Sequence, residues 1–185
     1  MDDIARFEMF CQLRRQIRGS GHHLIVGIDI AKDKHHAFFG TAKGQTLWRR
    51  LIFTNDLAGF NRLIEQVDTL KARHALEQVV FGMEPTGNYH KPLIHWLTEQ
   101  GYLVVFVAGK AVKDNREMLD GRWDKNDSKD SANIADLVSQ ERSLMIVKRQ
   151  ICQRGRIMPT CCPRQDTSQS RPSPGRASRI SNPSW

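Results

Sequence analysis

The sequence lacks long apolar runs, a leader-like start and a cysteine framework. No apolar run reaches the roughly 20 residues that a bilayer-spanning helix needs, and Asp2 and Asp3 stand where a signal peptide would carry positive charge. The four cysteines are Cys11, Cys152, Cys161 and Cys162. Their spacing matches neither a zinc site nor a disulfide framework. We therefore expect a cytoplasmic protein whose cysteines are incidental.

Acidic residues are scarce at the end of the chain. Residues 148–185 hold eight Lys or Arg and one acid, Asp166, which gives +7 of the net charge of +8. This stretch also holds five of the seven prolines and shows no period of 2 or 3.6. Such a segment buries too little apolar surface to offset its chain entropy. We predict three parts: an N-terminal amphipathic helix or extension (1–21), one folded domain (22–147), and a disordered, basic tail (148–185).

Within the folded part, the apolar pattern predicts alternating strands and helices. Strands are expected at 24–28, 37–39, 47–53, 78–83 and 102–107, and helices at 1–18, 57–72, 89–100 and 128–139. Asn55 or Asp56 is expected to cap the second of these helices. Three strands on short turns, followed by strand–helix alternation, favour an α/β fold with a mixed sheet and helices on its faces.

Four carboxylates occupy notable places in this pattern. Asp29 ends the first buried strand, and Glu84 ends the fourth. Asp127 and Asp130 are three residues apart at a helix start, a spacing that puts both on one face. If the first and fourth strands are neighbours, Asp29 and Glu84 leave the sheet at one edge. A helix crossing that edge would bring the two aspartates to them.

Four carboxylates in one pocket repel one another, so such a cluster would need divalent cations. Mg²⁺ prefers hard oxygen ligands, and two such ions can stabilise the attacking and leaving oxygens of a phosphodiester transfer. The alternative is four ordinary solvated carboxylates, with Asp127 or Asp130 only favouring the helix N-terminus. The pattern alone leaves both interpretations open.

Three sequence blocks carry a more specific resemblance. GIDIAKDKHHAFF, GMEPTGNYHKPLIHWL and KNDSKDSANIADLV resemble, in order and spacing, the signature blocks of the DEDD transposases of the insertion-sequence 110 family. The resemblance covers about residues 24–140. It implies an RNase H-like fold similar to the resolvase RuvC, with Asp29, Glu84, Asp127 and Asp130 as the catalytic, metal-binding tetrad for Mg²⁺ or Mn²⁺, as two ions.

The resemblance also implies partners. DNA is the expected substrate, and family members use a structured guide RNA from their own element and work as homo-oligomers. After about residue 147 we find no match to the family's further domain, which carries a nucleophilic serine. We therefore predict no complete transposition by this chain alone.

Basic residues around the tetrad are candidate nucleic-acid contacts, because Lys and Arg neutralise phosphates and an aromatic ring can stack on a base. The candidates are Lys32, Lys110, Lys113, Arg116, Arg122, Trp123, Lys125 and Lys129. A solvated turn lysine and a mobile basic loop over 110–129 are the plain alternatives. The histidine pairs 22–23 and 35–36 are expected to be surface or hairpin residues, since neighbours in extended chain point to opposite faces.

The leading functional prediction is a metal-dependent DNA transposase or recombinase. One alternative is a non-catalytic nucleic-acid-binding remnant of a transposase. A second is a phosphotransferase of the actin or sugar-kinase type, whose fold also opens with a Gly-Ile-Asp strand and hairpin. That class needs an Asp-x-Gly-x-Gly phosphate loop, which is absent here, and a second domain that this length cannot supply.

Overall fold

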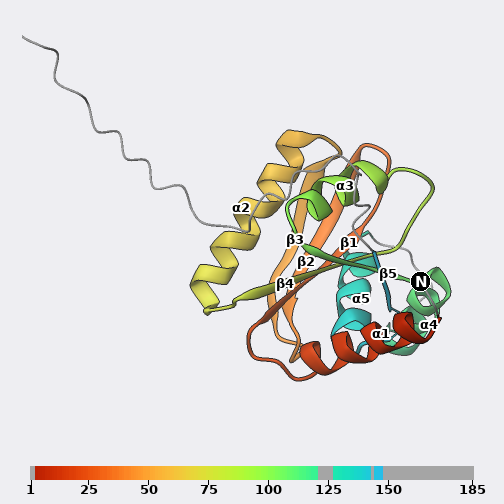
Figure 1. The fold of residues 1–185 in the computed structure, drawn as a ribbon. Coiled ribbons are helices and arrows are strands. Elements are labelled where there is room, and N and C mark those ends of the chain that lie inside the picture. Colours follow the sequence, from red (N-terminus) through yellow and green to blue (C-terminus); the bar gives the residue numbers. More distant parts are fainter. Residues whose placement is uncertain (1–2, 121–126, 143, 148–185) are drawn as a thin grey trace, which may run out of the picture. The chain divides into compact units, whose positions relative to one another are not determined.

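The computed structural model describes residues 3–120, 127–142 and 144–147. They form a six-stranded sheet in the order β3-β2-β1-β4-β5-β6 (Figure 1). The strands are β1 (His23–Asp29), β2 (Lys34–Thr41), β3 (Thr46–Thr54), β4 (Gln78–Met83), β5 (Leu103–Val107) and β6 (Leu144–Ile146). β1 is antiparallel to β2 and parallel to β4, so the predicted mixed sheet is confirmed.

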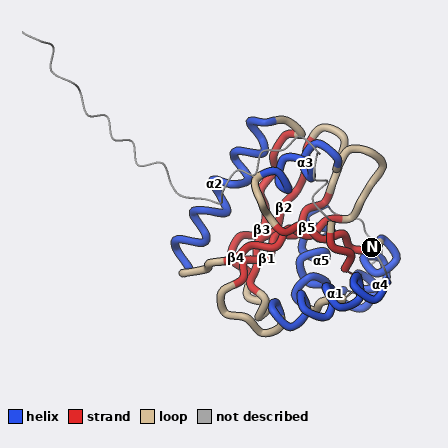
Figure 2. Tube along the Cα trace, viewed as in Figure 1, coloured by secondary structure: helices blue, strands red, loops and turns tan. Residues whose placement is uncertain are grey.

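Five helices accompany the sheet: α1 (Asp3–Ile17), α2 (Leu57–His74), α3 (Lys91–Glu99), α4 (Gly109–Asp120) and α5 (Asp127–Ser139). Figure 2 shows α2 and α3 on one side of the strands and α1, α4 and α5 on the other. Side chains alternate along each strand, which gives two apolar cores. Val26 and Phe81 lie in the core with Leu63 of α2, whereas Ile25 and Val80 lie in the core with Ile134 of α5.

The start of α2 is fixed by one carboxylate. Asp56 Oδ1 accepts hydrogen bonds from the Gly59 amide and from the Thr54 hydroxyl, both at 2.8 Å. The bond from the Gly59 amide, together with the one from Thr54, lowers the pKa of Asp56 below its usual value. Asp56, and not Asn55, is therefore the N-cap, and α2 begins directly after it.

Two elements differ from the sequence prediction. Residues 109–120 form the helix α4, although the sequence pattern predicts no helix there and leaves a mobile basic loop over 110–129 as one alternative. The short strand β6 is not among the predicted strands. The sequence of α4 shows no clear apolar period because its buried side is partly polar: Val112 and Asn115 are both buried. β6 pairs with β5. It is only three residues long, which is too short for its sequence to show a period.

The predicted disorder of 148–185 lies outside the described residues, and the domain boundaries stay a prediction. Among the described residues, no helix is long and apolar enough to cross a membrane.

Candidate active site

Asp29 and Glu84 come together through the pairing of β1 with β4. The two strands run parallel, and their last register pair is Ile28 with Met83. Asp29 and Glu84 are the next residues on each chain, and both are half-buried. The expected neighbourhood of the first and fourth strands is thus correct, and it puts two carboxylates at one sheet edge.

Glu84 also lies against the start of α4. Its Oε1 is 2.5 Å from the position that a Cβ on residue 109 would occupy. The absence of a side chain at Gly109 therefore allows the carboxylate to approach the helix in this position. The N-terminus of a helix carries partial positive charge, so this carboxyl group lies at the positive end of α4.

Two glycines seat α5 on the sheet. A Cβ on Gly27 would overlap the Ser131 carbonyl and stand 2.5 Å from the Ala135 amide, and a Cβ on Gly82 would overlap Val138. The backbone of α5 therefore rests directly on β1, and its side chains pack against Gly82 of β4. Asp130 directly precedes Ser131, whose carbonyl lies beside Gly27, two residues before Asp29 in β1.

Asp130 is buried and paired with a cation from α4. Its residue is 4% exposed, and its Oδ1 lies 2.5 Å from Nη2 of Arg116. The Nε atom of Arg116 is also buried and has no hydrogen-bond partner. α5 begins at Asp127, whose side chain lies outside the described part of the structure.

The described carboxylates of the predicted tetrad are Asp29, Glu84 and Asp130. Their oxygen donors are of the type that Mg²⁺ prefers. However, no group of three or more His, Cys, Asp or Glu side chains among the described residues is arranged to hold a metal ion. Asp130 is paired with Arg116, and the side chain of Asp127, the fourth predicted ligand, lies outside the described residues.

A family model described as a transposase, the DEDD transposases of insertion sequence 110, matches residues 26–154. The chain belongs to this family. The predicted α/β class of fold with a mixed sheet and helices on its faces is confirmed. No curated protein matches the chain.

Solved structures similar to this transposase-family chain include two of RuvC from Thermus thermophilus. RuvC in complex with a Holliday junction substrate is 12% identical, with a TM-score of 0.44, and the match covers 68% of this chain and 100% of that chain. A second RuvC structure is 11% identical, with a TM-score of 0.41, and the match covers 67% and 99%.

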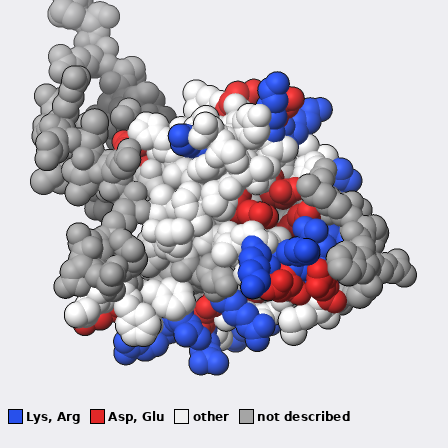
Figure 3. Space-filling model, turned by 90° about the vertical axis from the view of Figure 1, so that its right-hand side faces the viewer, with Lys and Arg blue, Asp and Glu red and all other residues white. Residues whose placement is uncertain are grey.

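The candidate nucleic-acid contacts of this DEDD-family chain are only partly grouped. Lys32 is exposed in the β1–β2 turn, and Lys110 and Lys113 are exposed on α4. Lys129 is half-buried at the start of α5, and Arg116 pairs with Asp130. On the face drawn in Figure 3, acidic side chains gather near the centre with Lys and Arg side chains beside them. Arg122, Trp123 and Lys125 lie outside the described residues.

A buried amide cluster between α4 and α5 was missed from the sequence. The Asn115 side-chain amide donates to Oδ1 of Asn133 at 2.5 Å and to Oδ2 of Asp136 at 3.0 Å. Asn133 donates in turn to the Val112 carbonyl at 2.6 Å. The available signal was the spacing of Asp130, Asn133 and Asp136, which places three polar residues on one face of α5.

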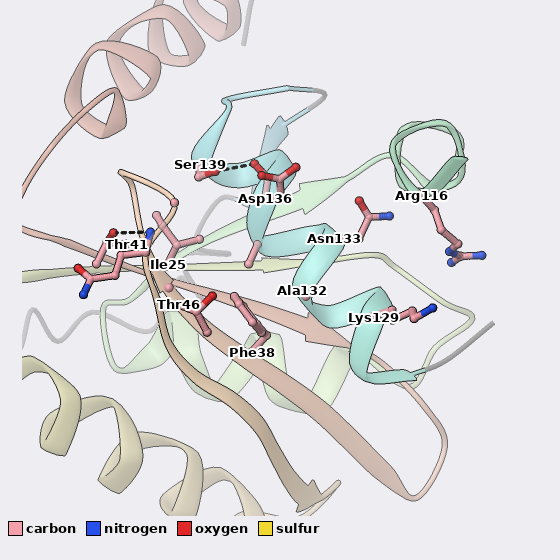
Figure 4. A pocket seen from close by; sticks show the side chains of 14 residues that line it. Ile25, Phe38, Thr41, Thr46, Arg116, Lys129, Ala132, Asn133, Asp136 and Ser139 are labelled. Carbon is pink, nitrogen blue, oxygen red and sulfur yellow. Dashed lines mark hydrogen bonds between the residues drawn. The ribbon is translucent and has the colours of Figure 1, made fainter. Parts of the chain in front are cut away.

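A cavity of about 350 Å³ adjoins this cluster (Figure 4). Ile25, Phe38 and Ala132 supply part of its apolar wall, and Arg116 and Lys129 supply its cations. The cavity thus opens next to the Asp130 ion pair, between α5 and the β2–β3 hairpin.

His35 supports the β1–β2 turn that leads away from Asp29. Its ring is buried, and its Nδ1 accepts a hydrogen bond from the Ala31 amide at 3.3 Å. Burial lowers the pKa of His35. His35 was expected in the hairpin or at the surface, and it is a buried hairpin residue.

Proposed function

We propose that this chain is the catalytic domain of an insertion-sequence transposase or recombinase, cleaving and transferring DNA phosphodiester bonds with divalent metal ions. The observation that carries the proposal is the pairing of β1 with β4, which sets Asp29 and Glu84 at one edge of the sheet. Family membership supports the class of reaction.

In this proposal the tetrad Asp29, Glu84, Asp127 and Asp130 holds two Mg²⁺ or Mn²⁺ ions. The ions, when bound, activate the attacking oxygen and stabilise the leaving 3′-oxygen. Two features of the chain support this assignment: the parallel register of β1 and β4 brings Asp29 and Glu84 to one edge of the sheet, and α5, which carries Asp130, packs on Gly27 and Gly82.

DNA is the proposed partner, and the exposed lysines near the site supply its contacts. Lys32 lies in the turn that follows Asp29, and Lys110 and Lys113 lie on α4, whose first residue Gly109 contacts Glu84. These charges would neutralise phosphates on either side of the carboxylates. A structured guide RNA and a homo-oligomer are proposed for this chain from its family alone.

A second candidate function is a nucleic-acid-binding remnant without catalysis. The ion pair of Asp130 with Arg116 favours it, because this pair leaves the described carboxylates without a three-ligand group. We do not propose the sugar-kinase alternative, because the chain belongs to a transposase family.

Cleavage of end-labelled four-way-junction DNA by the full chain, with Mg²⁺ or with EDTA, tests the proposal. We expect cleavage with Mg²⁺ alone, and loss of cleavage but not of DNA binding in Asp29→Asn. Asp33→Asn removes the same charge from an exposed turn position and serves as the control. DNA binding without metal-dependent cleavage by the unmodified chain would favour the remnant.

A further inference from the structure

An ion pair joins Arg116 to Asp130. The sequence predicts different roles for these residues, with Asp130 as a metal ligand and Arg116 as a nucleic-acid contact. The Asp130 side chain is 5% exposed and the Arg116 side chain 23% exposed. A carboxylate this deeply buried must be paired, because removal of one partner from a buried pair leaves an uncompensated charge. Arg116 supplies the required positive charge in this structure.

The position of Arg116 is set by the fold. Its neighbour Asn115 is buried and bonded to Asn133 and Asp136 of α5, and Asn133 is also bonded to the Val112 carbonyl of α4. These hydrogen bonds join α4 to α5 close to the ion pair. Asn115 is the neighbour of Arg116 on α4, and Asn133 lies three residues after Asp130 on α5. The ion pair thus follows from the packing of the two helices.

The same helix meets a second carboxylate of the proposed tetrad. Glu84 Oε1 lies against Gly109 at the positive end of α4, while Arg116, two turns further along, holds Asp130. One helix therefore offers positive charge to two carboxylates that come from different elements of the fold.

We propose that Arg116 is a positioning residue that occupies Asp130 in place of a divalent cation, and that metal binding requires Arg116 to release it. This inference rests on the proposed function, because it concerns the same carboxylates. It explains why no three-ligand group forms among the described residues. It also assigns Arg116 a role that a simple phosphate contact would not have, namely a charge that competes with the metal.

The test is calorimetric titration of MnCl₂ into the metal-free full chain, compared with Arg116→Gln. Release of a competing partner should tighten the apparent Kd for Mn²⁺ by about tenfold, within the usual range of coupling between sites. Without metal, Arg116→Gln should melt at a lower temperature than the parent chain, because Asp130 is left unpaired. Saturating Mn²⁺ should raise the melting temperature of Arg116→Gln by more than it raises that of the parent chain.

Two further variants define the effect. Arg73→Gln removes the same charge from an exposed position in the last turn of α2, and it should leave the affinity unchanged. Asp130→Asn, added to Arg116→Gln, should abolish the gain in affinity. If Arg116→Gln does not fold, Arg116→Met keeps an aliphatic stem but removes the charge, and its affinity should likewise exceed that of the parent chain.

The outcomes separate this inference from the proposed function. Equal or weaker Mn²⁺ binding by a folded Arg116→Gln or Arg116→Met, with saturable binding by the parent chain, would overturn the competition and leave the metal site standing. Absence of saturable binding in every variant would overturn both. A gain that is also seen in Arg73→Gln would reduce the effect to net charge and would overturn the role of Arg116.

Discussion

Asp29 and Glu84 each follow the last register pair of two adjacent parallel strands, β1 and β4. The carboxyl ends of neighbouring parallel strands meet at one edge, so the two side chains leave the sheet together although 54 positions separate them in the sequence. Ser131 of α5 lies beside Gly27, two residues before Asp29, because Gly27 leaves room for the Ser131 carbonyl.

The first prediction concerns this pair. Asp29→Asn or Glu84→Gln should weaken Mn²⁺ binding by more than about tenfold, because loss of a group that only orients a metal ligand already costs about 10–100-fold. The double variant should weaken it little further, because contacting residues of one site act non-additively. Calorimetric titration gives the three affinities. Glu65→Gln on α2 is the charge-matched control, and simple additivity of the two losses would show that the residues do not share a site.

The second prediction concerns the seat of α5. Gly27→Ala should lower the free energy of unfolding by about 3 kcal/mol, the upper end for overpacking, because the new Cβ would overlap backbone atoms of α5 rather than a flexible side chain. Urea denaturation measures the loss. Gly21→Ala is the control, since its Cβ would meet only the end of Lys43 at 3.5 Å. Similar stability of the two variants would contradict the close packing of α5 on β1.

The third prediction concerns the amide cluster. Asn133→Ala removes the partner of Asn115 and of the Val112 carbonyl, and buried groups left unsatisfied cost about 1–3 kcal/mol. The free energy of unfolding should fall by that amount. Asn61→Ala, at an exposed position of α2, should change it by less than about 0.5 kcal/mol. Hydrogen exchange should quicken in α4, and unchanged exchange there would mean that the cluster does not fasten the helix.

The fourth prediction concerns pH. Burial lowers the pKa of His35 in the folded chain below its ordinary value of 6.5. Above 6.5 the ring is neutral in both states, so it contributes no pH dependence. Below 6.5 the unfolded chain binds a proton that the folded chain resists, and stability falls by at most about 1.4 kcal/mol per pH unit from this group.

Chemical denaturation at pH 7.5, 6.0 and 5.0 checks the sign. His35→Gln should be less stable than the parent chain at pH 7.5, because the ring's contact with Phe53 is lost, and should lose less stability on acidification. His74→Gln, at the exposed end of α2, should retain the parent slope. Parallel slopes for the parent chain and His35→Gln would contradict a neutral, buried His35.

The sequence by itself determined the local elements and the family. β4 has the predicted bounds, and β1 and α2 lie within one or two residues of theirs, because an apolar run and a 3.6-residue period are local properties of the chain. The three motif blocks likewise pointed to the DEDD transposases, to which the chain belongs. Asp29 and Glu84 could be placed at strand ends from these patterns.

Only the tertiary structure decided which charges meet. The pattern grouped Asp130 with three other carboxylates, whereas packing of α4 on α5 gives it Arg116 as its partner. α4 itself was not predicted, since its buried side contains Asn115 and so breaks the apolar period. A sequence encodes which side chains favour burial, but the partner of a buried charge depends on which distant segments the completed fold brings into contact.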